Sequence, residues 1–291
     1  MTCLGPWTPA FAGVTREWFA PWASVNDEWL VYGPSIRYLG PMIEVRDLSK
    51  SFGGIHAVRD VSFTARDGEI TGIIGPNGAG KTTILRLIYT VLAPDSGRTL
   101  VDGIDARLDR RSVQRRIGVL PDVRGLYPRL TGREHIAYFG ALHGITGEPL
   151  QKRIAALART LNMEDFIDRR TRGFSRGQQM KVALARALVH EPHNILLDEP
   201  TNGLDVGTSR AVRDLVRRFR AEGRCIVLSS HIMQEVSALA DRIVIVSGGR
   251  IALQGTPEEL RRATGLADLE EIFMVATEGR DAAPALMAGE D

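Results

Sequence analysis

The chain has 291 residues, of which 44% are hydrophobic and 25% are charged, and its formal net charge is +2. These values are typical of a globular protein with one large or two small domains, and they argue against nucleic acid or an anionic membrane as the main partner. The sequence holds no apolar run of about 18 residues, the length that a transmembrane helix needs, and its two cysteines exclude a disulfide framework, so Cys225 is expected to be a buried, reduced thiol.

Residues 1–41 differ from the rest of the chain. They contain all four tryptophans, and their prolines and glycines recur without a helical or alternating apolar period. A functional tail that packs its aromatic side chains on a partner is one interpretation. We prefer the interpretation that this segment is disordered, or that translation begins at Met42, because chain termini are poorly ordered unless they are tied down.

From Met42 onward, short apolar or alternating runs predict a series of strands. They are residues 43–48, 58–64, 70–74, 99–101 and 117–120. Residues 122–172 instead predict a helical subdomain that extends to about residue 190. Thr131 and Glu134 form a capping box at the start of its first helix, and residues 150–161 predict a second. The aromatic pair Tyr138 and Phe139 could be a docking surface or the small core of this subdomain.

The second half of the chain returns to alternating strands and helices. The predicted strands are 195–197, 225–228, 243–246 and 250–254, and the predicted helices are 206–221, 232–240 and one that starts at Pro257. Apolar strands without alternation, separated by helices, indicate an α/β fold with a mostly parallel sheet that is covered on both faces. We expect one domain over residues 42–265 and a C-terminal helix and tail over 266–291, disordered from Asp281.

The stretch Gly75–Thr82 matches the phosphate-binding pattern G-x-x-x-x-G-K-[ST] between a predicted strand and a predicted helix at 83–88. Its glycines let backbone N–H groups turn toward phosphate oxygens, and the positive end of the helix strengthens that field. Lys81 can then reach the β- and γ-phosphates, and the Thr82 hydroxyl can bind Mg²⁺. The predicted nucleotide-binding residues of this loop are Gly75, Pro76, Asn77, Gly78, Ala79, Gly80, Lys81, Thr82 and Thr83.

Two further motifs carry chemistry. The apolar strand 195–197 ends in Asp198, which can bind Mg²⁺, and in Glu199, which can polarise an attacking water; the alternative is an acidic turn before a proline. Ser175 and Gln178 form a second capping box, which is a sufficient structural explanation of both residues. The functional interpretation is that this helix end binds an anion through the Gly177 N–H, and that it serves another subunit because the chain's own P-loop already binds phosphate.

In their order and spacing these motifs resemble those of ATP-binding subunits of ABC transporters, over residues 43–276. The matching segments are a Walker A motif at Gly75–Thr82, a signature at Phe174–Gln178, a Walker B motif at Ile195–Glu199, a D-loop at Gly203–Asp205 and a switch histidine at His231. Phe52 stands where the family has an aromatic side chain that stacks on adenine, and core packing is the alternative. Because no internal repeat is present, the chain carries one cassette.

The resemblance implies a P-loop NTPase core of the ABC ATPase type, with an N-terminal antiparallel β region, a mostly parallel sheet and the inserted helical subdomain. It implies an ATP hydrolase that uses ATP and Mg²⁺. The implied catalytic residues are Glu199, His231 and Lys81, and the implied metal ligands are Thr82 and Asp198. The residues implied to act on the partner subunit are Ser175, Arg176, Gly177 and Gln178 of the signature and Asp205 of the D-loop.

The implied partners are a second ATPase subunit, in a homodimer or heterodimer that sandwiches two ATP molecules, and a separate permease at the cytoplasmic face of the inner membrane. Residues 124–131 and 138–144 resemble ABC-2-type exporters, most nearly their sodium-extruding branch. The alternatives are another cargo (drug, lipid or polysaccharide), an importer, or a soluble ABC ATPase that acts on ribosomes or DNA. Such soluble proteins usually carry two cassettes or a long coiled-coil insertion, and this sequence shows neither.

Two positions depart from the family pattern. The signature has Phe174 and Arg176 in place of leucine and glycine, and the Arg176 cation could assist phosphate binding. Asp122 stands where the Q-loop glutamine is expected, so a carboxylate replaces the neutral amide oxygen that usually coordinates Mg²⁺. The alternative is that Asp122 faces solvent or caps a local turn near Arg124.

Overall fold

The computed structural model describes residues 42–122 and 125–278. The expectations for residues 1–41, for Arg124 and for the tail from Asp281 lie outside the described residues. The strands are β1 (Ile43–Phe52), β2 (Ile55–Ala65), β3 (Ile70–Ile74), β4 (Ser96–Val101), β5 (Ile104–Asp105), β6 (Ile117–Leu120), β7 (Asn194–Asp198), β8 (Cys225–Ser230), β9 (Arg242–Ser247) and β10 (Arg250–Gly255). The helices are α1 (Lys81–Ile88), α2 (Arg110–Arg116), α3 (Gly132–Leu142), α4 (Gly147–Thr160), α5 (Arg176–Leu188), α6 (Val206–Ala221), α7 (Met233–Ser237), α8 (Pro257–Thr264) and α9 (Leu269–Glu278).

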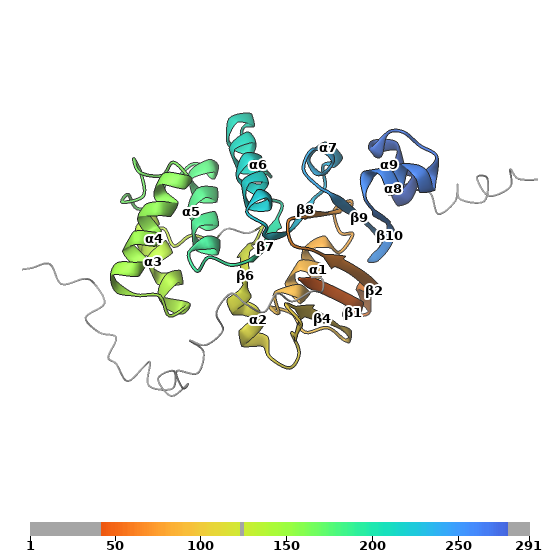
Figure 1. The fold of residues 1–291 in the computed structure, drawn as a ribbon, viewed down its shortest axis with the longest axis horizontal. Coiled ribbons are helices and arrows are strands. Elements are labelled where there is room, and N and C mark those ends of the chain that lie inside the picture. Colours follow the sequence, from red (N-terminus) through yellow and green to blue (C-terminus); the bar gives the residue numbers. More distant parts are fainter. Residues whose placement is uncertain (1–41, 123–124, 279–291) are drawn as a thin grey trace, which may run out of the picture. The chain divides into compact units, whose positions relative to one another are not determined.

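The strands form two sheets. A four-stranded antiparallel sheet has the order β2-β1-β4-β5, and a six-stranded sheet has the order β10-β9-β3-β8-β7-β6 (Figure 1). In the larger sheet only β10 runs antiparallel to its neighbour. Every residue of β3, β7 and β8 is buried, which explains why these strands read as continuous apolar runs rather than as alternating ones.

The two faces of the larger sheet belong to two separate hydrophobic cores. On β3, Ile70 and Ile74 pack into the core formed with α3 to α9, whereas Ile73 packs into the core formed with α1 and the antiparallel sheet. Successive strand residues point to opposite faces, so one short strand supplies both cores. The sheet is therefore covered on both faces, by helices on one side and mainly by β1, β2 and α1 on the other.

One predicted helix is shorter than expected, and one helix was not predicted. The helix expected over 232–240 is only α7, Met233–Ser237, because the chain beyond it returns to the sheet: the Asp241 N–H donates to the Ile70 carbonyl at 2.9 Å. The Ile70 N–H in turn donates to an Asp241 carboxylate oxygen at 2.9 Å. Helix α2 was not predicted, because Val113 is its one buried residue and a single apolar position gives no helical period.

The helical subdomain begins with the predicted capping boxes in place. Thr131 caps α3 together with Glu134, and Ser175 caps α5 together with Gln178. The two aromatic residues of α3 differ in their surroundings. Tyr138 is 47% exposed, as a docking surface requires, whereas Phe139 packs against the core. Within residues 42–122 and 125–278, no helix combines the length and the apolar character that crossing a bilayer requires.

Candidate active site

Three parallel strands bring the predicted site residues to one edge of the sheet. Strand β8 lies between β3 and β7, so the carboxyl ends of all three are neighbours. The P-loop follows β3, Asp198 ends β7, and His231 follows β8 directly. Ligands of open α/β sheets bind at this edge, outside the carboxyl ends of the strands.

Gly80 gives the P-loop its shape. It caps α1 with a φ of 108°, a backbone conformation that side chains with a Cβ rarely adopt. A Cβ atom at Gly80 would lie 2.5 Å from the carbonyl oxygen of Ala57. The turn therefore requires glycine both for its dihedral angle and for the close approach of a neighbouring backbone, and it leaves the N-terminal N–H groups of α1 facing the site.

The Lys81 ammonium is 6% exposed and lies over the loop. It donates to the carbonyl oxygens of Gly75 and Pro76 at 2.8 and 3.2 Å, and it lies 3.6 Å from a carboxylate oxygen of Glu199. A buried cation requires such partners because desolvation is costly. The arrangement holds one positive charge between the P-loop and the end of β7.

Thr82 and Asp198 meet where Mg²⁺ is expected. The Thr82 hydroxyl donates to Asp198 Oδ1 at 3.1 Å, and the Ser229 hydroxyl donates to the same oxygen at 2.6 Å. A hydroxyl and a carboxylate are hard oxygen ligands, and Mg²⁺ typically takes only one or two carboxylates from the protein and the remainder from phosphates and water. The donor set fits Mg²⁺. Ser229, which was not predicted from the sequence, orients the Asp198 carboxylate.

Glu199 and His231 form the other half of the site. His231 Nδ1 lies 2.9 Å from Glu199 Oε2, and the Glu199 N–H donates to the Ser229 hydroxyl at 3.1 Å. Because an ionised carboxylate only accepts hydrogen bonds, Nδ1 carries the proton when Glu199 is charged. Glu199 also has a φ of 48°, a left-handed conformation that non-glycine residues adopt only where the surrounding structure enforces it.

A cavity of about 440 Å³ opens over these groups. It is lined by Ala57, Asn77, Gly78, Ala79, Gly80, Lys81, Thr82, Thr83, Asp122, Glu199, Asn202 and His231. Asp122 is exposed to solvent and lines the same cavity as the P-loop and Glu199. Ala57 and Asn202 were not predicted, because neither carries a motif of its own and both arrive from other segments of the chain.

The remaining predicted residues lie outside this cavity. Phe52, at the end of β1, is 45% exposed with the Lys50 ammonium 5.5 Å from its ring centroid, so the core-packing alternative is wrong. Gly75 and Pro76 contribute the carbonyl oxygens that hold Lys81. Asp205 caps α6 by accepting from the hydroxyl and the N–H of Thr208 at 2.7 and 2.8 Å, and these hydrogen bonds lower the pKa of its carboxyl.

The signature residues are at the N-terminus of α5. A Cβ atom at Gly177 would lie 3.2 Å from the Thr208 hydroxyl, so the signature and the capped start of α6 are in close contact. The Ser175 hydroxyl accepts from the Gln178 N–H at 3.2 Å. Neither these residues nor Arg176 line the chain's own nucleotide cavity. The structure therefore separates the signature from the P-loop of the same chain.

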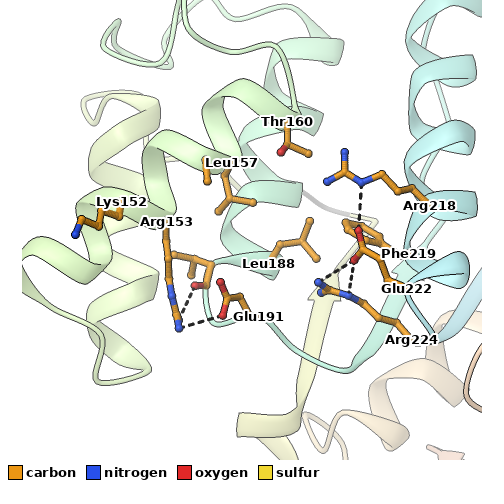
Figure 2. A pocket seen from close by; sticks show the side chains of 12 residues that line it. Lys152, Arg153, Leu157, Thr160, Leu188, Glu191, Arg218, Phe219, Glu222 and Arg224 are labelled. Carbon is orange, nitrogen blue, oxygen red and sulfur yellow. Dashed lines mark hydrogen bonds and ion pairs between the residues drawn. The ribbon is translucent and has the colours of Figure 1, made fainter.

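A second cavity, of about 340 Å³, lies between α4 and the ends of α5 and α6 (Figure 2). Its apolar lining includes Leu157, Leu188 and Phe219, and each basic side chain that lines it pairs with a glutamate. The pairs are Lys152–Glu148, Arg153–Glu191, Arg218–Glu222 and Arg224–Glu222. Because these cations are already paired, and because no predicted site residue lines the cavity, we do not assign the nucleotide to it.

Comparison with known proteins agrees with this geometry. The family model described as ABC transporter matches residues 58–202. The ABC transporter ATP-binding protein NatA of Bacillus subtilis is 43% identical over 238 residues, which are 80% of this chain and 97% of that protein. The Nod factor export ATP-binding protein I of Rhizobium etli is 34% identical over 218 residues, 75% of this chain and 69% of that protein.

Solved structures give the same result. A structure of the ATP-binding subunit of an ABC transporter aligns over 81% of this chain and 99% of its own, with a TM-score of 0.75 and 30% identity. A dimeric ATP-binding cassette in a post-hydrolysis state, bound to ADP and Pi, aligns over 74% and 98%, with a TM-score of 0.68 and 28% identity. The predicted α/β fold is confirmed, and the chain belongs to the ABC transporter family as an ATP-binding subunit that hydrolyses ATP.

Proposed function

We propose that this chain is the ATPase subunit of an exporter and that it hydrolyses ATP in the cavity over its P-loop. The observation that carries the proposal is the convergence of Lys81, Glu199 and His231 on one cavity at the carboxyl ends of β3, β7 and β8. The roles follow from the chemistry of each group. The N-terminal N–H groups of α1 and the Lys81 ammonium stabilise charge on the phosphates.

Glu199 acts as the general base toward the attacking water. His231 donates from Nδ1 to the Glu199 carboxylate and so holds it in one orientation. Thr82 and Asp198 would hold Mg²⁺, which would neutralise charge on the phosphates. Glu199 lies between the Lys81 ammonium at 3.6 Å and His231 Nδ1 at 2.9 Å, so its carboxylate is held from two sides.

The signature residues are proposed to act on the nucleotide of a second subunit. Ser175 and Gly177 lie at the N-terminus of α5, where a helix end attracts anions, yet they do not line the chain's own cavity. A head-to-tail dimer would bring this helix end to the partner's ATP. The dimeric cassette among the similar structures supports this proposal.

The proposed permease contact is on the helical subdomain. Tyr127, Tyr138 and Leu142 are 61%, 47% and 61% exposed, an uncommon degree of exposure for large apolar side chains that are close in the sequence. Export is supported by the relatives named as Nod factor export proteins. Sodium is proposed as the cargo from the sequence resemblance, with the protein bound to the cytoplasmic face of the membrane through the permease.

The catalytic proposal is tested by Glu199→Gln. This change removes the base but keeps the shape of the side chain, so hydrolysis should fall by about a hundredfold or more while ATP-dependent dimer accumulates in size-exclusion chromatography. Adding Ser175→Arg should abolish that dimer without weakening ATP binding to the monomer. Wild-type turnover by Glu199→Gln would assign the base to another residue, and loss of ATP binding by Ser175→Arg would leave Ser175 as a helix cap only.

The export proposal is tested with the proposed permease, which is to be sought among the membrane proteins encoded beside this chain. Inverted vesicles that contain both proteins should accumulate ²²Na⁺ when ATP is added, and vesicles with the Glu199→Gln subunit should not. ATP-dependent uptake of another solute would replace sodium as the cargo. ATP-driven loss of solute from these vesicles would indicate import instead.

A further inference from the structure

A partly buried hydrogen-bond network links the segments that carry Glu199 and His231. Glu235, on α7, accepts from the Thr201 hydroxyl at 2.6 Å and from the Ser230 hydroxyl at 3.0 Å, both through Oε2. Thr201 and Ser230 are 7% and 1% exposed. Hydrogen bonds to a charged acceptor are strong, and a buried hydroxyl that loses its acceptor is costly.

The two hydroxyls come from the segments that carry the catalytic pair. Thr201 follows Glu199 in the same turn, where the Asn202 N–H donates to the Glu199 carbonyl at 3.2 Å. Ser230 directly precedes His231, and its hydroxyl also accepts from the Ile232 N–H at 3.1 Å. The Glu235 carboxylate therefore joins the turn after β7 to the segment after β8, on strands that are neighbours in the sheet (Figure 1).

This connection is separate from the one through Ser229. Ser229 joins Asp198 to the Glu199 backbone and so fixes the metal side of the site. Among the described hydrogen bonds, the His231 ring has Glu199 as its one partner and none with Ser229. Glu235 does not line the nucleotide cavity. Any effect of Glu235 on catalysis must therefore pass through the segments that it joins.

We propose that Glu235 is a positioning residue for ATP hydrolysis, holding His231 within hydrogen-bond distance of Glu199. The inference rests on the roles proposed above for Glu199 and His231. Both residues belong to irregular segments, and Glu199 has a left-handed backbone. The segments after β7 and β8 must therefore be held at a fixed distance from each other. A misplacement of about 1 Å in such a pair can lower turnover about a hundredfold.

The test compares Glu235→Ala with Glu235→Gln. The alanine variant removes the acceptor, so kcat should fall by about tenfold or more, while KM for ATP changes by less than about twofold because no nucleotide contact is lost. The glutamine variant keeps an amide oxygen that can accept from both hydroxyls, so it should restore most of the turnover. Ser237→Ala, at an exposed hydroxyl of the same helix, is the matched control and should behave as wild type.

A double-mutant cycle with His231→Ala separates positioning from a merely structural role. If Glu235 acts through His231, Glu235→Ala should lower kcat less than about twofold further in the His231→Ala background. A further tenfold loss there would overturn the inference and leave the role of His231 intact. Wild-type turnover by His231→Ala alone would overturn both. If Glu235→Ala does not fold, Thr201→Val removes one donor at nearly constant shape, and the same cycle applies to it.

Discussion

Acid pH is expected to destabilise the protein at a stacked pair of histidines. His143 ends α3 and His190 follows α5, and their rings are parallel within 4° with centroids 3.7 Å apart. His190 Nε2 lies 3.2 Å from the Ile117 carbonyl oxygen, so it donates to that oxygen when it carries the proton. Nδ1 of His190 is buried without a hydrogen-bond partner in the described structure, so a second proton there would gain no acceptor.

The expected size follows from the pKa of His190. Burial, and next the positive charge that His143 can carry, lower this pKa from 6.5 to about 4. Burial, and next Arg115, also lower the pKa of His143. As the pH falls, the unfolded chain binds these protons before the folded chain does. The contribution of the neutral histidines to the unfolding free energy is therefore complete above about pH 6.5 and is lost as the pH falls toward 4. For His190 alone, the loss at pH 5 is about 2 kcal/mol, since one pKa unit is worth about 1.4 kcal/mol.

The assay is urea unfolding at pH 7.5 and pH 5 on wild type and His190→Gln. The wild type should lose about 2 kcal/mol more unfolding free energy between these pH values than the variant loses, because titrating groups outside the stacked pair contribute equally to both proteins. His56→Gln, at an exposed histidine on the antiparallel sheet, serves as the control and should keep the wild-type difference. Identical pH dependence of wild type and His190→Gln would refute the reasoning.

Three further predictions concern the nucleotide site. Asp122→Gln should shift the Mg²⁺ concentration that half-saturates ATP hydrolysis and leave maximal turnover largely unchanged. An unchanged Mg²⁺ titration would show that Asp122 does not lie near the metal. Phe52→Ala should weaken ATP binding by about 1 to 3 kcal/mol, the value of one base–aromatic stack, as measured with a fluorescent ATP analogue, and equal affinity would exclude the stack. Gly80→Ala should cost about 1 to 3 kcal/mol of stability through its φ of 108°, and an unaltered melting temperature would contradict the strained turn.

The parts of the site that were predictable are those set by contiguous residues. The shape of the P-loop depends on its own glycines and on the helix that follows, so Gly75–Thr82 could be read directly from the sequence. The two capping boxes are also local, since each needs only a residue and its third successor. Apolar runs identified β3, β7 and β8 for the same reason, because burial on both faces favours apolar residues at successive positions of a strand.

The parts that were not predictable depend on strand order. Ser229 and Glu235 carry no motif, and they matter because β8 lies between β3 and β7, which no local pattern specifies. The length of α7 was mispredicted on the same ground, since its end is set by Asp241 bonding to Ile70, a residue distant in the sequence. Apolar spacing records which residues are buried, whereas the order of strands is fixed by packing between elements that are far apart along the chain.

The charges in the cavity give Asp122 its importance. Asp122 and Glu199 both line the cavity, Asp198 lies at its edge through Thr82, and Lys81 is the only lysine or arginine among the described lining residues. Three carboxylates against one ammonium leave an excess of negative charge before any triphosphate enters. Like charges in close proximity repel one another and the entering triphosphate, and a divalent cation offsets that repulsion. Glutamine at residue 122 would lower the negative charge around the cavity by one carboxylate. Asp122 is therefore expected to make nucleotide binding depend more steeply on Mg²⁺ than glutamine would.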